Sequence, residues 1–407
     1  AASPPLSFNF GLERTRACFL LSDVIIPLPI GFAFLIDKYI KASIVELQEA
    51  MESGAVTSAE ITRMYLSRIR AYDKAGPNLN TMIWVNWDAV TEAHMLDRER
   101  KTIGPRGVLH GIPIILKDNY DTFDLPTSAG TLALAGNIAR DDAHQVQKLR
   151  EAGVVILGKS NMHELASGIT TVGSLGGQTL NPYDLQRNPG GSSGGTGAAI
   201  AASFAAVGWG SDTCGSIRIP SSQNNLVGLR PTKGLSSIDG IIPLSHTQDV
   251  GGPLARSIED LAIALDATVG ADPADPATMI LEGRELPNFV SVLDPNALAG
   301  SRIGILESYF GEGGMEAPAA NLVRHAIAKM VAPREHRRAG RRADGAARVK
   351  VLHRDGAARV DPFADARRRR CAIVVAKVGP PDVITENEQE GGLFFPRGGA
   401  RQEEGEG

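Results

Sequence analysis

The chain has 407 residues, of which 43% are hydrophobic and 22% are charged, and its formal net charge at pH 7 is -4. This composition is typical of a soluble globular protein, and the length allows one large core or two ordinary ones. The charge balance gives no reason to expect nucleic acid or an anionic membrane as a partner. Its cysteines, Cys18, Cys214 and Cys371, are too far apart for a disulfide framework or a metal motif, so no metal is expected.

Residues 1–42 are predicted to form an N-terminal extension. Residues 17–36 are mainly apolar and follow two arginines, as in a secretory signal peptide. However, Asp23 interrupts the run, and Pro27 and Pro29 would break a helix there. We therefore favour a buried or irregular extension over a signal peptide or a membrane span. A cytoplasmic location is expected, with secretion as the alternative if the run is a signal.

Regular helical patterning begins at Ser43. Apolar residues recur at helical spacing in two segments between residues 43 and 73, which predicts two amphipathic helices. Thr57 with Glu60 three residues later forms a capping-box pattern that starts the second helix. After these helices, the short apolar run TMIWV and a further helix reaching Leu96 are expected.

The next segment predicts a strand, a helix and a second strand. The apolar run Ile112 to Leu116 indicates a buried strand, DAHQVQKLREAG a helix ended by Gly153, and VVIL the second strand. A further helix is expected to start near Asn161. This alternation implies βαβ units, so the predicted fold class is α/β, with a central mixed sheet flanked by helices on both faces.

The stretch GVVILGKS, residues 153–160, matches the phosphate-binding pattern G-x-x-x-x-G-K-[ST]. In such a loop the x residues direct N–H groups at the ligand, but here they are Val, Val, Ile and Leu, which prefer a strand. No strand ending in a magnesium-binding aspartate is evident. We therefore expect a strand entering the core, with Lys159 at its end, either solvated or paired.

Residues 188–253 are rich in glycine, serine and alanine. A flexible linker is disfavoured because Ile200, Phe204 and Val207 recur at helical spacing, so a tightly packed helix is expected over 194–206. The pattern G-x-S-x-G occurs at GSSGG, which would make Ser193 a nucleophile on a strand-to-helix turn. A loop precedes it instead of a strand, so a glycine-rich turn is favoured.

Two further segments could carry chemistry. Lys117 ends an apolar run, where it is either a lysine that reaches solvent or a buried base whose pKa is lowered by desolvation. Ser216 follows small residues and glycine, a setting in which successive N–H groups can converge on one point. Asp212 could hold that loop through its N–H groups, and Cys214 without a histidine partner is a weak rival nucleophile.

Taken in order, these segments resemble the amidase signature family. The resemblance extends from about Ser43 to about Lys329 and is closest to the peptide-amidase and general amidase group. It rests on the following motifs: LKDN, GGQTLNP, PGGSSGG, GSDTCGSIRIP, GLRPTKG and QDVGGPLARSIED.

The resemblance implies a Ser–Ser–Lys triad that hydrolyses a carboxylic amide through an acyl-enzyme, a reaction for which no cofactor is expected. Ser216 matches the family nucleophile, Ser192 the bridging serine that follows a cis peptide bond, and Lys117 the terminal base. The resemblance also implies an oxyanion hole built from the backbone N–H groups of Thr213, Cys214, Gly215 and Ser216. A small-molecule or peptide amide is the expected substrate, and a homodimer is left open.

The catalytic domain is predicted to span residues 43–330. Residues 331–407 form an atypical tail rich in arginine, alanine and glycine, in which DGAARV occurs twice. A basic arm is one interpretation, and a segment that does not naturally continue the fold, for example after a reading-frame shift, is the one we favour. If so, the sheet is incomplete at its C-terminus. Two alternatives therefore stay open, an inactive truncated family member and the amidase subunit of a tRNA-dependent amidotransferase.

Overall fold

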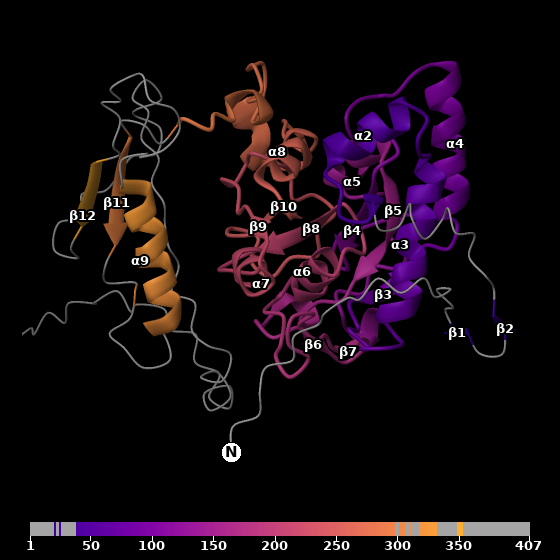
Figure 1. Ribbon diagram of the computed structural model, residues 1–407, viewed down its shortest axis with the longest axis horizontal. Coiled ribbons are helices and arrows are strands. Elements are labelled where there is room, and N and C mark those ends of the chain that lie inside the picture. The colour runs from indigo at the N-terminus through magenta and orange to yellow at the C-terminus, as the bar shows by residue number, and fades with distance from the viewer. Residues whose placement is uncertain are drawn as a thin grey trace, which may run out of the picture. The chain divides into compact units, whose positions relative to one another are not determined.

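The computed structural model describes residues 20–21, 24–25, 38–297, 301–306, 310, 317–331 and 348–352. The chain divides into two compact units, residues 1–292 and 293–407, which are considered separately (Figure 1). Most of the apolar run at 17–36 and most of the tail at 331–407 lie outside the described residues. The boundaries of the extension, the catalytic domain and the tail therefore stay predictions.

The helices and strands follow one another in mixed order along the chain. The helices are α2 (Ile44–Glu52), α3 (Ser58–Tyr72), α4 (Ala89–Thr102), α5 (His144–Glu151), α6 (Gly194–Ala201), α7 (Arg218–Gln223), α8 (Ile258–Asp266) and α9 (Ala317–Val331). The strands are β1 (Leu20–Leu21), β2 (Val24–Ile25), β3 (Met82–Val85), β4 (Pro113–Lys117), β5 (Val155–Ser160), β6 (Val172–Gly173), β7 (Gly177–Gln178), β8 (Val207–Asp212), β9 (Val227–Gly228), β10 (Val250–Ala255), β11 (Arg302–Leu306) and β12 (Arg348–Leu352).

A mixed six-stranded sheet organises the first unit, in the order β3-β5-β4-β8-β10-β9. The three central strands β5, β4 and β8 run parallel, and the outer strands β3, β10 and β9 pair antiparallel to their neighbours. This confirms the predicted α/β class with a mixed sheet. Parallel central strands bring their carboxyl ends to one edge, which is where open α/β sheets place their sites.

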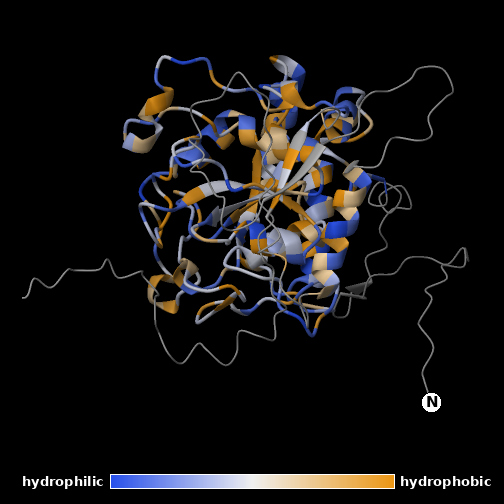
Figure 2. Cartoon of the chain, turned by 90° about the vertical axis from the view of Figure 1, so that its left-hand side faces the viewer, coloured by the Kyte–Doolittle hydropathy of each residue, from blue (hydrophilic) through white to orange (hydrophobic). Residues whose placement is uncertain are grey.

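The sheet lies between layers of helices (Figure 1). Helices α3 and α4 pack on β4 and β5, and α8 packs on β8, β9 and β10. Helix α6 packs closely on β8: a Cβ built on Gly208 of the strand would lie 2.5 Å from the side chain of Thr196 on the helix, so only glycine fits there. Figure 2 shows apolar residues gathered on the strands at the centre, where Ile114, Leu116 and Trp209 are fully buried.

Several local predictions are confirmed. Thr57 and Glu60 form the capping box of α3, and Gly153 ends the segment after α5 with φ +82°. The stretch GVVILGKS carries strand β5, as its β-branched residues favour. The helix expected to reach Leu96 continues to Thr102.

Two helix predictions were wrong in extent or existence. The segment after Asn161 contains only a single 3-10 turn, Glu164–Ala166, because Asn161 is held by tertiary bonds: its N–H donates to the Thr81 carbonyl at 2.7 Å. Helix α6 ends at Ala201 instead of continuing to residue 206. There Arg256 donates to the carbonyls of Ile200 and Ala205, and the chain turns into β8.

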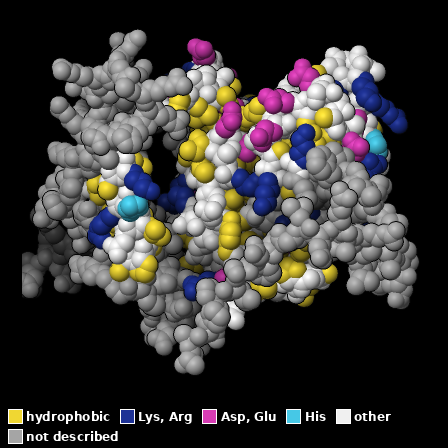
Figure 3. Space-filling model, in the orientation of Figure 1, with side chains coloured by type: hydrophobic (Ala, Val, Ile, Leu, Met, Phe, Trp, Pro, Cys, Tyr) yellow, Lys and Arg dark blue, Asp and Glu magenta, His cyan; other side chains and the backbone are white. Residues whose placement is uncertain are grey.

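The second unit contains a parallel pair, β11 and β12, and helix α9. Ile305, Phe310 and Ala320 form its small apolar cluster. Within the part of the chain that the structure describes, no helix is both long and apolar enough to cross a bilayer. On the face of the first unit seen in Figure 3, acidic side chains lie among the lysines and arginines.

Candidate active site

Polar side chains from three elements meet at the carboxyl edge of the central strands. Lys117 is the last residue of β4, and Ser211 and Asp212 end the parallel strand β8. The turn that starts α6 contributes Ser192. Because β4 and β8 are neighbours, the ends of both strands and this turn lie together.

Lys117 is fully buried and bonded to hydroxyl groups. Its Nζ lies 2.7 Å from Oγ of Ser192 and 2.8 Å from Oγ of Ser211. Burial lowers the pKa of the Lys117 amine from 10.5 to about 7, although the carboxylates of Asp212 and Asp249 favour its charged form. The burial interpretation of Lys117 is therefore confirmed, and the solvent-reaching one was wrong.

Ser192 is held by its backbone. It follows a cis peptide bond from Gly191, as the resemblance implied, and its carbonyl accepts the N–H of His163 at 3.0 Å. A Cβ built on Gly191 would lie 2.8 Å from the carbonyl carbon of Ile169, so only glycine fits there. The hydroxyl oxygen of Ser192 accepts from the Lys117 amine at 2.7 Å.

Ser216 is tied through its backbone to Ser193, the residue after Ser192. Its carbonyl accepts the N–H of Ser193 at 3.2 Å, and its side chain is 5% exposed at the start of the segment leading into α7. Ser193 itself donates its hydroxyl to the carbonyl of Ser211 at 3.1 Å and follows a loop, not a strand. The nucleophile-elbow interpretation of Ser193 therefore lacks the strand it requires.

Asp212 organises the loop between Ser211 and α7. Its carboxylate accepts the N–H of Gly215 at 2.8 Å and that of Ile217 at 3.0 Å, and it pairs with the Arg218 guanidinium. Although burial works to raise the pKa of Asp212, the bonds from Arg218 and the Ile217 N–H hold it below its usual value. Asp212 is thus a loop anchor, as expected, and it engages the N–H of Gly215.

Lys159 occupies a second buried position, on β5. Its Nζ bonds to Thr127 Oγ1 at 2.9 Å, to the Pro126 carbonyl at 3.2 Å and to Thr122 Oγ1 at 3.3 Å. Of the two surroundings expected for it, the solvated one was wrong, because Lys159 is fully buried and its bonds go to hydroxyls and a carbonyl. Burial lowers its pKa to about 8, and Asp118 is the first of several carboxylates that oppose this shift.

Two residues of the cluster were missed from the sequence. Ser211 accepts from Lys117, and the side-chain Nδ2 of Asn119 donates to the same Ser211 oxygen at 3.0 Å. Both adjoin recognised positions, since Asn119 lies in LKDN and Ser211 directly precedes Asp212. Neither residue type is distinctive enough in sequence to signal this role.

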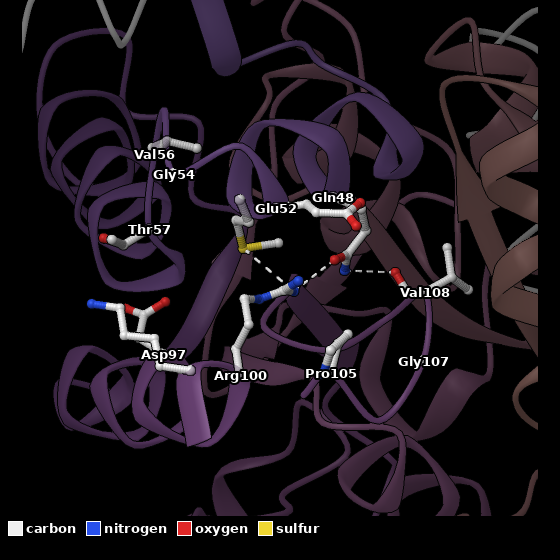
Figure 4. A pocket seen from close by; sticks show the side chains of 12 residues that line it. Gln48, Glu52, Gly54, Val56, Thr57, Asp97, Arg100, Pro105, Gly107 and Val108 are labelled. Atoms are coloured by element: carbon white, nitrogen blue, oxygen red, sulfur yellow. Dashed lines mark hydrogen bonds between the residues drawn. The ribbon is translucent and has the colours of Figure 1, made fainter. Parts of the chain in front are cut away.

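A cavity of about 590 Å³ opens elsewhere in the first unit (Figure 4). It lies among α2, α4 and the segment before Val108, and Arg100 reaches across it to Gln48 Oε1 at 2.6 Å. Its lining includes none of the residues around Lys117. We therefore place the candidate chemistry at the lysine–serine cluster, where a buried amine and hydroxyls converge, and not in this cavity.

Comparison with known proteins identifies the family. The family model described as Amidase matches residues 60–336, more than half of the chain. The chain belongs to the amidase family. The matched region includes Lys117, Ser192 and Ser216 and all six strands of the sheet.

Solved structures of family members share this fold. The peptide amidase of Stenotrophomonas maltophilia has a TM-score of 0.68 at 42% identity, covering 77% of this chain and 62% of that one. An amidase family protein of Bacillus anthracis has a TM-score of 0.71 at 33% identity, covering 80% of this chain and 63% of the other.

Curated relatives include enzymes of two kinds. A probable amidase of Arabidopsis thaliana is 40% identical over 279 residues, which cover 65% of this chain and 53% of the relative. A glutamyl-tRNA(Gln) amidotransferase subunit of Thermoanaerobacter pseudethanolicus is 40% identical over 269 residues, covering 66% of this chain and 54% of the relative. The chain thus spans about half the length of the curated relatives it matches.

Proposed function

We propose that this protein hydrolyses a carboxylic amide to an acid and ammonia or an amine, with Ser216 as nucleophile, Ser192 as bridge and Lys117 as base. The observation that carries the proposal is the 2.7 Å hydrogen bond between the fully buried Lys117 amine and the Ser192 hydroxyl. Membership of the amidase family and 40% identity to a probable amidase support the reaction class.

The Lys117 amine has the property that a general base requires. A serine hydroxyl is a poor nucleophile until its proton is removed, and lysine can accept that proton only when neutral. A pKa of about 7 leaves roughly half of the amine neutral at neutral pH. Burial therefore converts an ordinarily charged side chain into a usable base.

The proposed reaction proceeds in two stages. The Ser216 oxygen attacks the amide carbon while its proton passes to Ser192, whose own proton passes to the Lys117 amine. The carbon–nitrogen bond then breaks, and the leaving nitrogen takes a proton back along the same path. In the second stage water attacks the Ser216 ester, which releases the acid and restores the serine. A hydroxyl can serve as the bridge because it both donates and accepts.

The negative oxygen of the tetrahedral intermediate needs hydrogen-bond donors. We assign this role to backbone N–H groups of the loop Thr213 to Ser216, with Thr213, Cys214 and Ser216 as the main donors because Asp212 already accepts the N–H of Gly215. One such donor typically contributes about 3–4 kcal/mol to the transition state. Cys214 contributes through its backbone, so its thiol is not required.

The test combines labelling with turnover. The full chain would be treated with a fluorophosphonate, which phosphorylates activated serines, and the modified residue would be located by mass spectrometry. We expect the adduct on Ser216, none in Ser216→Ala, and ammonia or amine release from members of a panel of aliphatic, aryl and peptide amides. An adduct on another residue would contradict the assignment. A cooperatively melting protein without labelling or turnover would favour the inactive-truncation alternative.

Similarity to amidotransferase subunits supports a second candidate function. The glutamyl-tRNA(Gln) amidotransferase subunit of Thermotoga maritima has a TM-score of 0.62 at 28% identity, covering 80% of this chain and 63% of that one. In that case the protein would release ammonia from glutamine only when a partner subunit is bound. Glutamine turnover that appears only when amidotransferase partner subunits are added would select this function, and turnover of other amides by the chain alone would reject it.

A further inference from the structure

Asn119 is a buried side chain beside the cluster that the proposed reaction does not use directly. It lies two residues after Lys117 and is 1% exposed, and its backbone carbonyl accepts the N–H of Ile242 at 2.8 Å. Its Nδ2 lies 3.0 Å from Oγ of Ser211 and 3.4 Å from the carbonyl oxygen of Ile242. Because a carbonyl only accepts, the nitrogen must face it, so Asn119 is the donor to Ser211.

The hydroxyl oxygen of Ser211 therefore receives two N–H groups, one from Asn119 and one from Lys117. A hydroxyl oxygen has two lone pairs and carries a single hydrogen. With both lone pairs engaged, its hydrogen points away from both donors. Ser211 then acts toward the Lys117 amine as an acceptor only.

The direction of this bond matters for a neutral amine, which has two N–H donors and one lone pair. If Ser211 turned its hydrogen toward Lys117, it would occupy the lone pair that must take the proton from Ser192. We propose that Asn119 is a positioning residue, which keeps Ser211 as an acceptor and so leaves the Lys117 lone pair facing Ser192. This inference rests on the proposed function of the same cluster.

The alternative role for Asn119 is structural, since its backbone already ties the end of β4 to Ile242. Side-chain variants separate the two roles because the backbone bond survives them. Asn119→Leu keeps a similar shape but removes the donor. We expect Ser216 to react with a fluorophosphonate about 10- to 100-fold more slowly in this variant. This is a part of the roughly 10²- to 10⁴-fold that a general base contributes to a rate. For an amide that the wild type hydrolyses, the KM of Asn119→Leu should equal that of the wild type.

Asn119→Asp tests the same contact through charge. A carboxylate cannot donate, and it would join Asp212 and Asp249, the carboxylates that already act on the Lys117 amine. The added negative charge favours the ammonium form, so a higher pH is needed to make the base neutral. We expect the acidic limb of the rate profile to move upward by about one pH unit.

Asn224 provides a matched control. It is also fully buried, and its Nδ2 donates to the carbonyls of Pro189 and Pro220 at 2.7 and 2.8 Å. Like Asn119, it has a side-chain oxygen that accepts from no described residue. Asn224→Leu therefore removes a buried carboxamide without touching Ser211, and its pH profile should coincide with that of the wild type.

The readout is the rate of Ser216 labelling by a fluorophosphonate from acidic to alkaline pH, with a thermal melt of each full-length variant. It needs no identified substrate. If Asn119 acts through Ser211, adding Asn119→Leu to Ser211→Ala should cause no further loss. An additive loss, or wild-type profiles in both Asn119 variants while Lys117→Ala is inert, would overturn this inference alone. Wild-type labelling of Lys117→Ala would instead overturn the proposed triad.

Discussion

Two lysines on neighbouring parallel strands are both fully buried, yet their surroundings differ. Lys117 on β4 bonds to the hydroxyls of Ser192 and Ser211. Lys159 on β5 bonds to threonine hydroxyls and a carbonyl. Four carboxylates act on its amine, those of Asp118, Asp121, Asp124 and Asp142.

Burial lowers the pKa of both amines, to about 7 for Lys117 and about 8 for Lys159. A lowered pKa therefore does not by itself distinguish a base from a structural cation. The neighbours do so, because Lys117 bonds to two serine hydroxyls, whereas the amine of Lys159 lies in the field of several carboxylates. We propose the first as catalytic and the second as structural.

The largest expected effect is on turnover, and it separates the two lysines directly. Lys117→Met should lower kcat by at least about 10³-fold, since it removes the general base. Lys159→Met should leave the kcat of the folded fraction near that of the wild type. Initial rates on one amide, normalised to the folded fraction from circular dichroism, provide the measurement. Equal losses in both variants would remove the functional distinction.

The same two variants should change stability by different amounts. The lowered pKa of Lys117 means that the unfolded chain binds its proton more tightly, so wild-type stability rises with pH between about 7 and 10.5. Lys117→Met removes the free-energy cost of holding an ammonium group in this buried position. After subtraction of the two lost hydrogen bonds, it should raise the unfolding free energy by about 3 kcal/mol below pH 7, and by less at higher pH.

Lys159→Met should raise the unfolding free energy by less than Lys117→Met does, because burial lowers the Lys159 pKa only to about 8 and three hydrogen bonds are lost. The buried carboxylate of Asp118 also loses a cation that favours its charged form. Urea unfolding of both variants at several pH values checks the pair. A destabilised Lys117→Met whose deficit grows as the pH falls would show that the ammonium form is well solvated in the folded protein.

The smallest expected effect is on the pH profile. The Asp249 carboxylate favours the charged form of Lys117, so Asp249→Asn should lower the pKa of the amine. The acidic limb of kcat/KM should move to lower pH by a few tenths of a unit. Asp142→Asn, which removes a carboxylate acting on Lys159 instead, should leave the limb in place. A shift of the same size in both variants would mean that the profile reports general electrostatics rather than Lys117.

Local patterns were predictable where neighbouring residues decide the structure. The capping box at Thr57 and Glu60, the buried strand ending at Lys117 and the rejection of a phosphate loop at residues 153–160 all rest on short-range preferences. The helix expected near Asn161 was wrong, because the hydrogen bonds of Asn161 to the carbonyls of Asn80 and Thr81, just before β3, override helix propensity there.

The sequence by itself determined the alternation of strands and helices, and its motifs indicated which lysine and serines to consider. Only the tertiary structure decided the partners of each group. It brought Ser192 and Ser211, 75 and 94 residues away along the chain, to the same Lys117 amine, and it buried Lys159. Desolvation and hydrogen-bond direction depend on atoms that meet only after folding, so no local pattern can reveal them.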